Sequence, residues 1–134
     1  MLFYIDFKAG KPVYLQLVDQ VKAAAASGAL KPGEALPSIR PLAEQLRLNR
    51  NTVAKAYAEL ESQGVAENQP GRGCYLRPNH SPYSPEVRDR LLTSDIDTAV
   101  VQAHHLQVEQ KEFFGLVQRR WNHFEQERNQ AQSK

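Results

Sequence analysis

The chain has 134 residues, 41% of them hydrophobic, and a formal net charge of +2, which suits one small globular domain with an appendage. No apolar run approaches the roughly 18 residues that span a bilayer. The first residues also lack the basic segment followed by an apolar segment that marks a signal peptide, so we expect a cytoplasmic protein with no membrane partner. The single Cys74 excludes an intramolecular disulfide and a thiolate zinc cluster, and we expect it to be a small buried residue.

The first two predicted elements are an extended segment and a helix. Residues 3–7 alternate in the manner of a short strand or extended arm, which residues 10–12 end. A helix is predicted from Val13 to about Ser27, with Gly28 as its stop. Its apolar side consists of Leu17, Val21, Ala24 and Ala25.

Residues 36–60 predict two short helices joined by a tight turn. Ser38 can cap the first helix, with Pro41 in its opening turn, and Asn49 can cap the second, which Gly64 ends. The two apolar stripes are Ile39, Leu42, Ala43 and Leu46, then Val53, Ala56, Tyr57 and Leu60. With both stripes packed on the first helix, we expect one core for all three helices.

The outer face of the second short helix carries groups that suit DNA. Burial of its stripe leaves Arg50, Asn51, Thr52 and Lys55 pointing outward near its N-terminal end. Cations, amides and hydroxyls of this kind contact base edges and phosphates in a major groove. The alternative is an ordinary helical hairpin with a polar face. The charge distribution leans toward DNA, because residues 1–78 hold ten Lys and Arg against seven Asp and Glu, whereas residues 79–134 hold seven against eight.

A β-hairpin is predicted beyond Gly64. Residues 65–69 and 74–77 flank the turn at 70–73, in which two glycines bracket Arg72. These glycines let the backbone approach a partner closely and leave one cation at the tip, as a minor-groove or phosphate contact requires. The alternative is a solvent loop in which Arg72 has no role.

Three helices followed by a hairpin make a winged helix-turn-helix, and residues 10–77 resemble the DNA-binding domain of the GntR family of bacterial transcription regulators. The matching residues are Pro12, Tyr14, Gln16, Gly28, Leu30, Pro32, Gly33, Leu36, Pro37, Ser38, Arg40, Leu42, Ala43, Arg50, Thr52, Val53, Ala56, Leu60, Gly64, Gly71, Arg72 and Gly73. By position, the resemblance implies that the DNA contacts are made by Arg40, Asn49, Arg50, Asn51, Gly71 and Arg72. Ala54 and Ile39 depart from the family pattern, and Ala54 removes one expected base contact.

The tail is predicted to hold two helices after a proline-rich linker at 79–85. Ser84 and Pro85 can begin the first helix, and its apolar side consists of Val87, Leu91, Ile96, Val100 and Ala103. Whether residues 93–95 break this helix into two pieces is left open. The second is expected from about Val108 to Gln126, with Phe113, Phe114, Val117, Trp121 and Phe124 along one face.

An apolar surface of this size is usually an interface. This tail resembles that of the YtrA branch of the GntR family, which implies homodimerisation. The expected interface consists of Leu91, Val100, Phe113, Phe114, Val117, Trp121 and Phe124. The alternative is a tail that packs back on its own N-terminal domain.

The remaining motifs predict no catalysis. His104 and His105 are adjacent, so on a helix they diverge by about 100° and cannot share one ion. The glycines show no nucleotide-binding pattern. We therefore expect a protein without a bound metal or cofactor and without enzymatic activity.

The sequence therefore predicts a mainly α protein with a small β-hairpin: a winged helix-turn-helix domain at 1–78, a linker at 79–85 and a two-helix dimerisation region at 86–134. We expect a homodimeric transcription regulator that binds double-stranded DNA at a pseudo-palindromic operator. A repressor is favoured and an activator stays open. The rival interpretation is a winged-helix module that binds protein or RNA. Any small-molecule effector is expected at the tail interface or between the tail and the winged helix.

Overall fold

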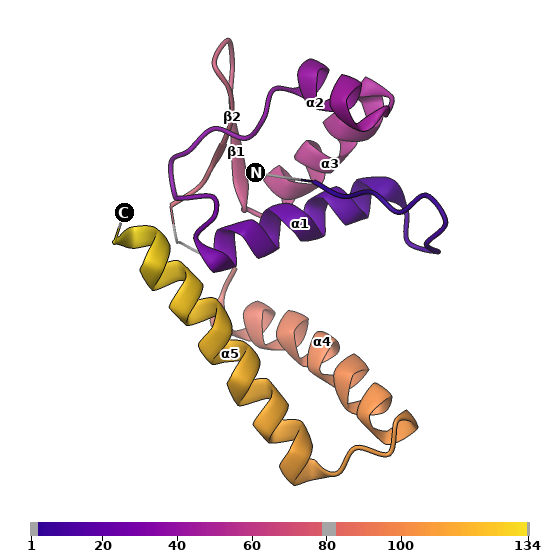
Figure 1. The fold of residues 1–134 in the computed structure, drawn as a ribbon. Coiled ribbons are helices and arrows are strands. Elements are labelled where there is room, and N and C mark those ends of the chain that lie inside the picture. Colours follow the sequence, from indigo (N-terminus) through magenta and orange to yellow (C-terminus); the bar gives the residue numbers. More distant parts are fainter. Residues whose placement is uncertain (1–2, 79–82, 134) are drawn as a thin grey trace.

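The computed structural model describes residues 3–78 and 83–133 (Figure 1). In chain order the described elements are α1 (Val13–Ser27), α2 (Ile39–Leu46), α3 (Arg50–Ser62), β1 (Ala66–Gln69), β2 (Gly73–Leu76), α4 (Pro85–His105) and α5 (Gln110–Gln132). This order confirms the predicted fold class, which is mainly α with one small antiparallel hairpin. No helix within these two described stretches is long and apolar enough to cross a membrane.

The predicted helix ends of the N-terminal domain are confirmed. Gly28 ends α1 with a φ of 80°, and Gly64 follows the end of α3 with a φ of 74°, both in the left-handed region that glycine tolerates. Asn49 caps α3, because its side-chain oxygen accepts the backbone N–H of Asn51 at 2.8 Å. Ser38 holds the N-cap position of α2 without a side-chain cap hydrogen bond.

One hydrophobic core joins the three helices and the hairpin. Of the twelve apolar residues predicted to line the three helices, eight are buried, and the other four, Ala24, Ala25, Ile39 and Leu46, pack against the core partly buried. The buried set also includes Phe3, Leu30, Leu36 and Leu76, which come from the arm, the loops and the wing. Helical periodicity cannot identify such residues, because each is the lone anchor of an irregular segment or strand end.

The N-terminal arm lies along α1 as an extended segment. Gln16 and Gln20, one turn apart on α1, each bond the backbone of the arm through both amide atoms, Gln16 at Asp6 and Gln20 at Tyr4. These side chains replace a neighbouring strand, so the arm satisfies its backbone groups without a sheet. The anchored arm places Phe3 in the core.

The wing is joined to the segment that precedes α2. Ala35 forms an antiparallel bridge with Tyr75, and the N–H of Leu36 donates to the carbonyl of Cys74 at 2.8 Å. The hairpin is therefore fixed relative to α2 and not only to α3. Cys74 is half-buried in this junction rather than fully buried as predicted.

The tail differs from the sequence prediction in three respects. The first helix, α4, is unbroken at residues 93–95, and α5 runs to Gln132, six residues beyond its predicted end. The expectation of one apolar side on α4 is also wrong, because at 100° per residue Leu91 and Ile96 stand about 140° apart. Ser84 accepts the N–H of Val87, so α4 begins where predicted. Residues 79–82 of the predicted linker lie outside the described residues.

The tail touches the winged helix at the C-terminal end of α1. Gly28 is buried there, and a Cβ built on it would lie 2.8 Å from the Cβ of Ala131 and 3.0 Å from the Cα of Arg128. Figure 1 shows α5 passing this end of α1, with α4 as the second arm of the tail. The alternative in which the tail packs back on its own domain thus holds for the last turns of α5.

Candidate nucleic-acid interface

The N-terminal end of α3 presents the predicted base-reading residues. Val53, Ala56, Tyr57 and Leu60 are all buried, which fixes the rotation of α3 and leaves Asn49, Arg50 and Asn51 exposed. Thr52 is half-buried beside them. The cap uses the side-chain oxygen of Asn49, so its amide N–H groups remain able to donate to a base or phosphate.

A part-buried hydrogen bond ties α3 to the segment before α2. The hydroxyl of Tyr57 donates to the carbonyl of Pro37 at 2.6 Å. Burial, with a smaller contribution from the charge of Cys74, raises the pKa of Tyr57 far above its ordinary value. The tyrosine therefore stays protonated and keeps the bond at any physiological pH.

Lys55 is less available than its position on α3 predicted. Its ammonium lies over the ring of Tyr14 on α1, 4.2 Å from the centroid, a contact worth about 0.5–1 kcal/mol at an exposed site. The sequence interpretation missed this pair because the two residues lie 41 positions apart. Lys55 adds a positive charge to α3, which is the recognition helix of the winged helix-turn-helix, while its side chain rests on Tyr14 of α1.

Arg40 lies on the exposed side of the first turn of α2. Its Nε is 3.9 Å from a carboxylate oxygen of Glu44, and both side chains are 74% exposed. Exposed pairs of this kind are worth roughly 0–1 kcal/mol, so Glu44 offers little competition to a DNA phosphate.

The wing tip has the geometry predicted for a backbone contact. Pro70 and Gly71 occupy the centre of a turn closed by the Arg72 N–H on the Gln69 carbonyl at 2.9 Å. Gly71 has a φ of 77°, as the third position of a type II turn requires. Arg72 is exposed at the tip, and Figure 1 shows the hairpin loop extending beyond the helices.

A hollow of about 360 Å³ separates the wing from the recognition helix. Arg72 lines it together with Ile39 of α2 and Ala54 of α3. Ile39 and Ala54 are the two residues that depart from the family pattern. The structure thus brings both residues to the hollow between the hairpin and α3.

Arg47 is a candidate contact that the sequence interpretation missed. It ends α2 with a φ of 57°, in a left-handed conformation that costs a non-glycine residue about 1–2 kcal/mol. The side chain is exposed in the turn between α2 and α3, with no ion pair among the described residues. No sequence signal marks it, since glycine or asparagine is the usual residue at such a helix end.

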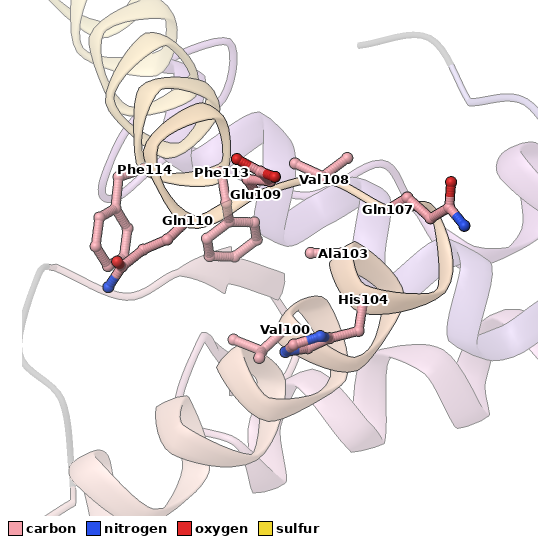
Figure 2. A pocket seen from close by; sticks show the side chains of 9 residues that line it. All are labelled: Val100, Ala103, His104, Gln107, Val108, Glu109, Gln110, Phe113 and Phe114. Carbon is pink, nitrogen blue, oxygen red and sulfur yellow. The ribbon is translucent and has the colours of Figure 1, made fainter.

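Large apolar side chains of the tail are uncovered in the single chain. The exposed fractions are 67% for Trp121, 59% for Phe114 and 49% for Val117. Figure 2 shows Phe113 pointing from α5 toward Val100 and Ala103 of α4, beside a cavity of about 590 Å³. A second groove, of about 500 Å³, is lined by Val117, Trp121 and Phe124 with Ala26 of α1.

The predicted interface residues therefore do not form one surface, because they line three different cavities. Val100, Phe113 and Phe114 meet at the first cavity, and Val117, Trp121 and Phe124 form the second groove. Leu91 joins neither, because it faces a different cavity, between the tail and the winged helix. As for metals, the described parts of the chain bring no three His, Cys, Asp or Glu residues together at a possible site.

Comparisons with known proteins agree with the winged helix-turn-helix fold. Residues 13–76 match the family described as bacterial regulatory proteins, gntR family. The chain is 36% identical over 108 residues to the HTH-type transcriptional repressor YtrA of Bacillus subtilis strain 168, which covers 81% of this chain and 83% of that protein.

Two solved structures are similar over most of the chain. A transcriptional antiterminator from Listeria monocytogenes EGD-e superposes with a TM-score of 0.77 at 29% identity, covering 89% of both chains. YtrA from Sulfolobus acidocaldarius, a GntR-family transcription factor, superposes with a TM-score of 0.62 at 34% identity, covering 75% of this chain and 99% of that one.

Proposed function

Because this chain belongs to the GntR family of bacterial regulatory proteins, and is therefore a DNA-binding transcription regulator, we propose that it represses transcription as a homodimer on a pseudo-palindromic operator. The observation that carries the proposal is the exposed start of α3, where Asn49, Arg50 and Asn51 lie at the surface of a helix held by its buried face. We assign the chain a cytoplasmic location and no catalytic activity.

The proposed DNA surface combines three elements. Arg50 and Asn51 read base edges from the major groove, where a bidentate contact discriminates by about 1–3 kcal/mol. Arg40 and Arg72 contact phosphates or the minor groove on either side. Two copies bound to adjacent half-sites cover a promoter and exclude polymerase without an additional domain, which favours repression over activation.

The uncovered apolar surface of the tail supports the homodimer. Trp121, Phe114 and Val117 are about half exposed or more in one chain, and contiguous apolar patches of this kind usually mark an interface. Pairing through the tail gives two recognition helices related by two-fold symmetry, which is what a pseudo-palindromic operator matches.

The DNA assignment is tested with Arg50→Ala, Arg72→Ala and the control Arg119→Ala, which removes an exposed cation from the tail. Operator and scrambled duplexes are titrated by fluorescence anisotropy over a salt series. Arg50→Ala should weaken operator binding more than scrambled binding, whereas Arg72→Ala should weaken both and flatten the salt dependence by roughly one unit per lost phosphate contact. Unchanged affinity in both variants refutes the surface, and tight binding to RNA or protein alone supports the rival module.

The dimer is tested with Trp121→Glu combined with Phe124→Glu. Charge buried at an interface penalises association while leaving the winged helix folded. Sedimentation should therefore show a monomer, and the circular dichroism spectrum of the whole chain should remain helical. Val101→Glu is the control, because Val101 is 68% exposed and lines none of the apolar cavities described above. A double variant that remains dimeric shows that this face is not the interface.

A further inference from the structure

A cavity of about 840 Å³ lies between the winged helix domain and the tail. One wall is formed by the C-terminal ends of α1 and α3 and by the base of the wing, and the other by α4 and α5. Its volume falls in the range of small-molecule sites, which often lie between domains. The contact of Gly28 with Ala131 closes α1 against α5 at its edge.

The charged side chains that line the cavity are of two kinds: an engaged set, joined by hydrogen bonds within the wall, and a free set, which forms no ion pair among the described residues. Lys22 donates to the side-chain oxygen of Gln63 at 2.9 Å, and the Gln63 amide donates to Glu59 at 2.9 Å. This chain of hydrogen bonds links one cation to one anion across the ends of α1 and α3. Lys22 and Glu59 thus largely balance each other within the wall.

The free set is positive. Lys31, Arg77 and Arg128 line the cavity without an ion pair in the described parts of the chain, against one remaining acid, Asp95. Arg128 is half-buried beside the Gly28 contact, so its charge is less screened than that of a surface arginine. Guanidinium groups favour carboxylates and phosphates, which they bind with two parallel hydrogen bonds.

Apolar side chains complete the lining. Leu91 of α4 faces the cavity from the tail, and Val65 with the ring of Pro32 faces it from the winged helix domain. An occupant that satisfies this wall and the free cations carries an acidic group and an apolar body.

We propose that this cavity binds a small organic acid, a carboxylate or phosphate with an apolar body, and that the bound acid sets the angle between the tail and the winged helix. In a dimer paired through the tail, this angle determines the separation of the two recognition helices, and hence operator affinity. The regulatory half of the inference rests on the proposed function, whereas binding of the acid does not.

Binding is tested with two fluorescent probes of the same body, anilinonaphthalene sulfonate and the uncharged phenylnaphthylamine. The ratio of their affinities reports the acidic group of the probe. Because Arg128 also lines the second groove of the tail whereas Lys31 does not, Lys31→Gln alone assigns the effect to this cavity. Lys31→Gln with Arg128→Gln should lower the sulfonate-to-neutral ratio about tenfold through loss of charge-assisted hydrogen bonds. Arg119→Gln, which removes a tail cation outside the cavity, should leave the ratio unchanged.

An unchanged ratio in the double variant, or an equal fall in the control, overturns the site. Lys31→Gln alone is measured as well, because Lys31 is exposed and its loss leaves packing intact; a fall of about threefold is expected, and none contradicts the site. Circular dichroism confirms that each variant is folded.

The regulatory half is tested by operator titration with and without saturating anilinonaphthalene sulfonate. Operator affinity should change by at least about threefold in the natural chain and not in the double variant, and by linkage the operator should change probe affinity by the same factor. DNA binding without this change overturns the regulatory inference and leaves the proposed function intact. No DNA binding at all refutes the proposed function, while the probe ratio still tests the cavity.

Discussion

Replacing Gly28 by alanine should destabilise the chain through two separable effects. The φ of 80° strains any residue with a Cβ by about 1–2 kcal/mol. The new methyl group would also lie 2.8 Å from the Cβ of Ala131 and 3.0 Å from the Cα of Arg128, so α5 must move, and overpacking of this kind costs about 1–3 kcal/mol. The sum for Gly28→Ala is therefore about 2–5 kcal/mol of unfolding free energy.

The chain offers a matched control for the backbone term. Gly33 has a φ of 86°, and a Cβ added there meets nothing within 4 Å. Gly33→Ala should therefore show the strain alone, and urea unfolding of both variants gives the contact with α5 as the difference. Equal losses of stability in the two variants would mean that α5 does not rest on α1.

A double-mutant cycle with Ala131→Gly locates the contact. Removing the Ala131 methyl group makes room for the new one, so the two changes should couple favourably by about 1 kcal/mol while the strain at residue 28 remains. Additivity within about 0.5 kcal/mol would refute the pairing of these two residues.

Two further changes test the turn and the core beside the DNA surface. Arg47→Gly should raise stability by roughly 0.5–1 kcal/mol in urea unfolding, because it relieves the strained φ, and should flatten the salt dependence of DNA binding; an unchanged salt slope would exclude Arg47 as a phosphate contact. Tyr57→Phe leaves the partly buried Pro37 carbonyl without its donor and should cost about 1–3 kcal/mol at pH 7 by thermal unfolding. Alkaline pH gives a third measurement. Because burial raises the pKa of folded Tyr57 above the ordinary 10.0, the contribution of Tyr57 to the free energy of unfolding is complete below pH 10. Above pH 10 this contribution declines, by roughly 1 kcal/mol between pH 10 and 11. A Tyr57→Phe variant with the same alkaline slope as the natural chain would contradict this assignment.

The sequence alone determined the local structure of the winged helix and its class. Gly28, Asn49 and Gly64 mark helix ends because their backbone conformations and caps are local properties, visible in a few neighbouring residues. Periodic apolar residues identified most of the core for the same reason. The family resemblance, carried by residues 10–77, identified a DNA-binding regulator that the comparisons confirm.

The tertiary structure alone decided which exposed groups are engaged and where the tail rests. Lys55 meets Tyr14 across two helices, and the wing pairs with Ala35 through Tyr75. Leu91, expected with the other tail residues, lines the cavity beside the winged helix instead, which is also bordered by the contact of Gly28 with α5. Each of these contacts joins residues far apart in the chain, and their distance in space depends on how whole helices pack, which no local pattern encodes.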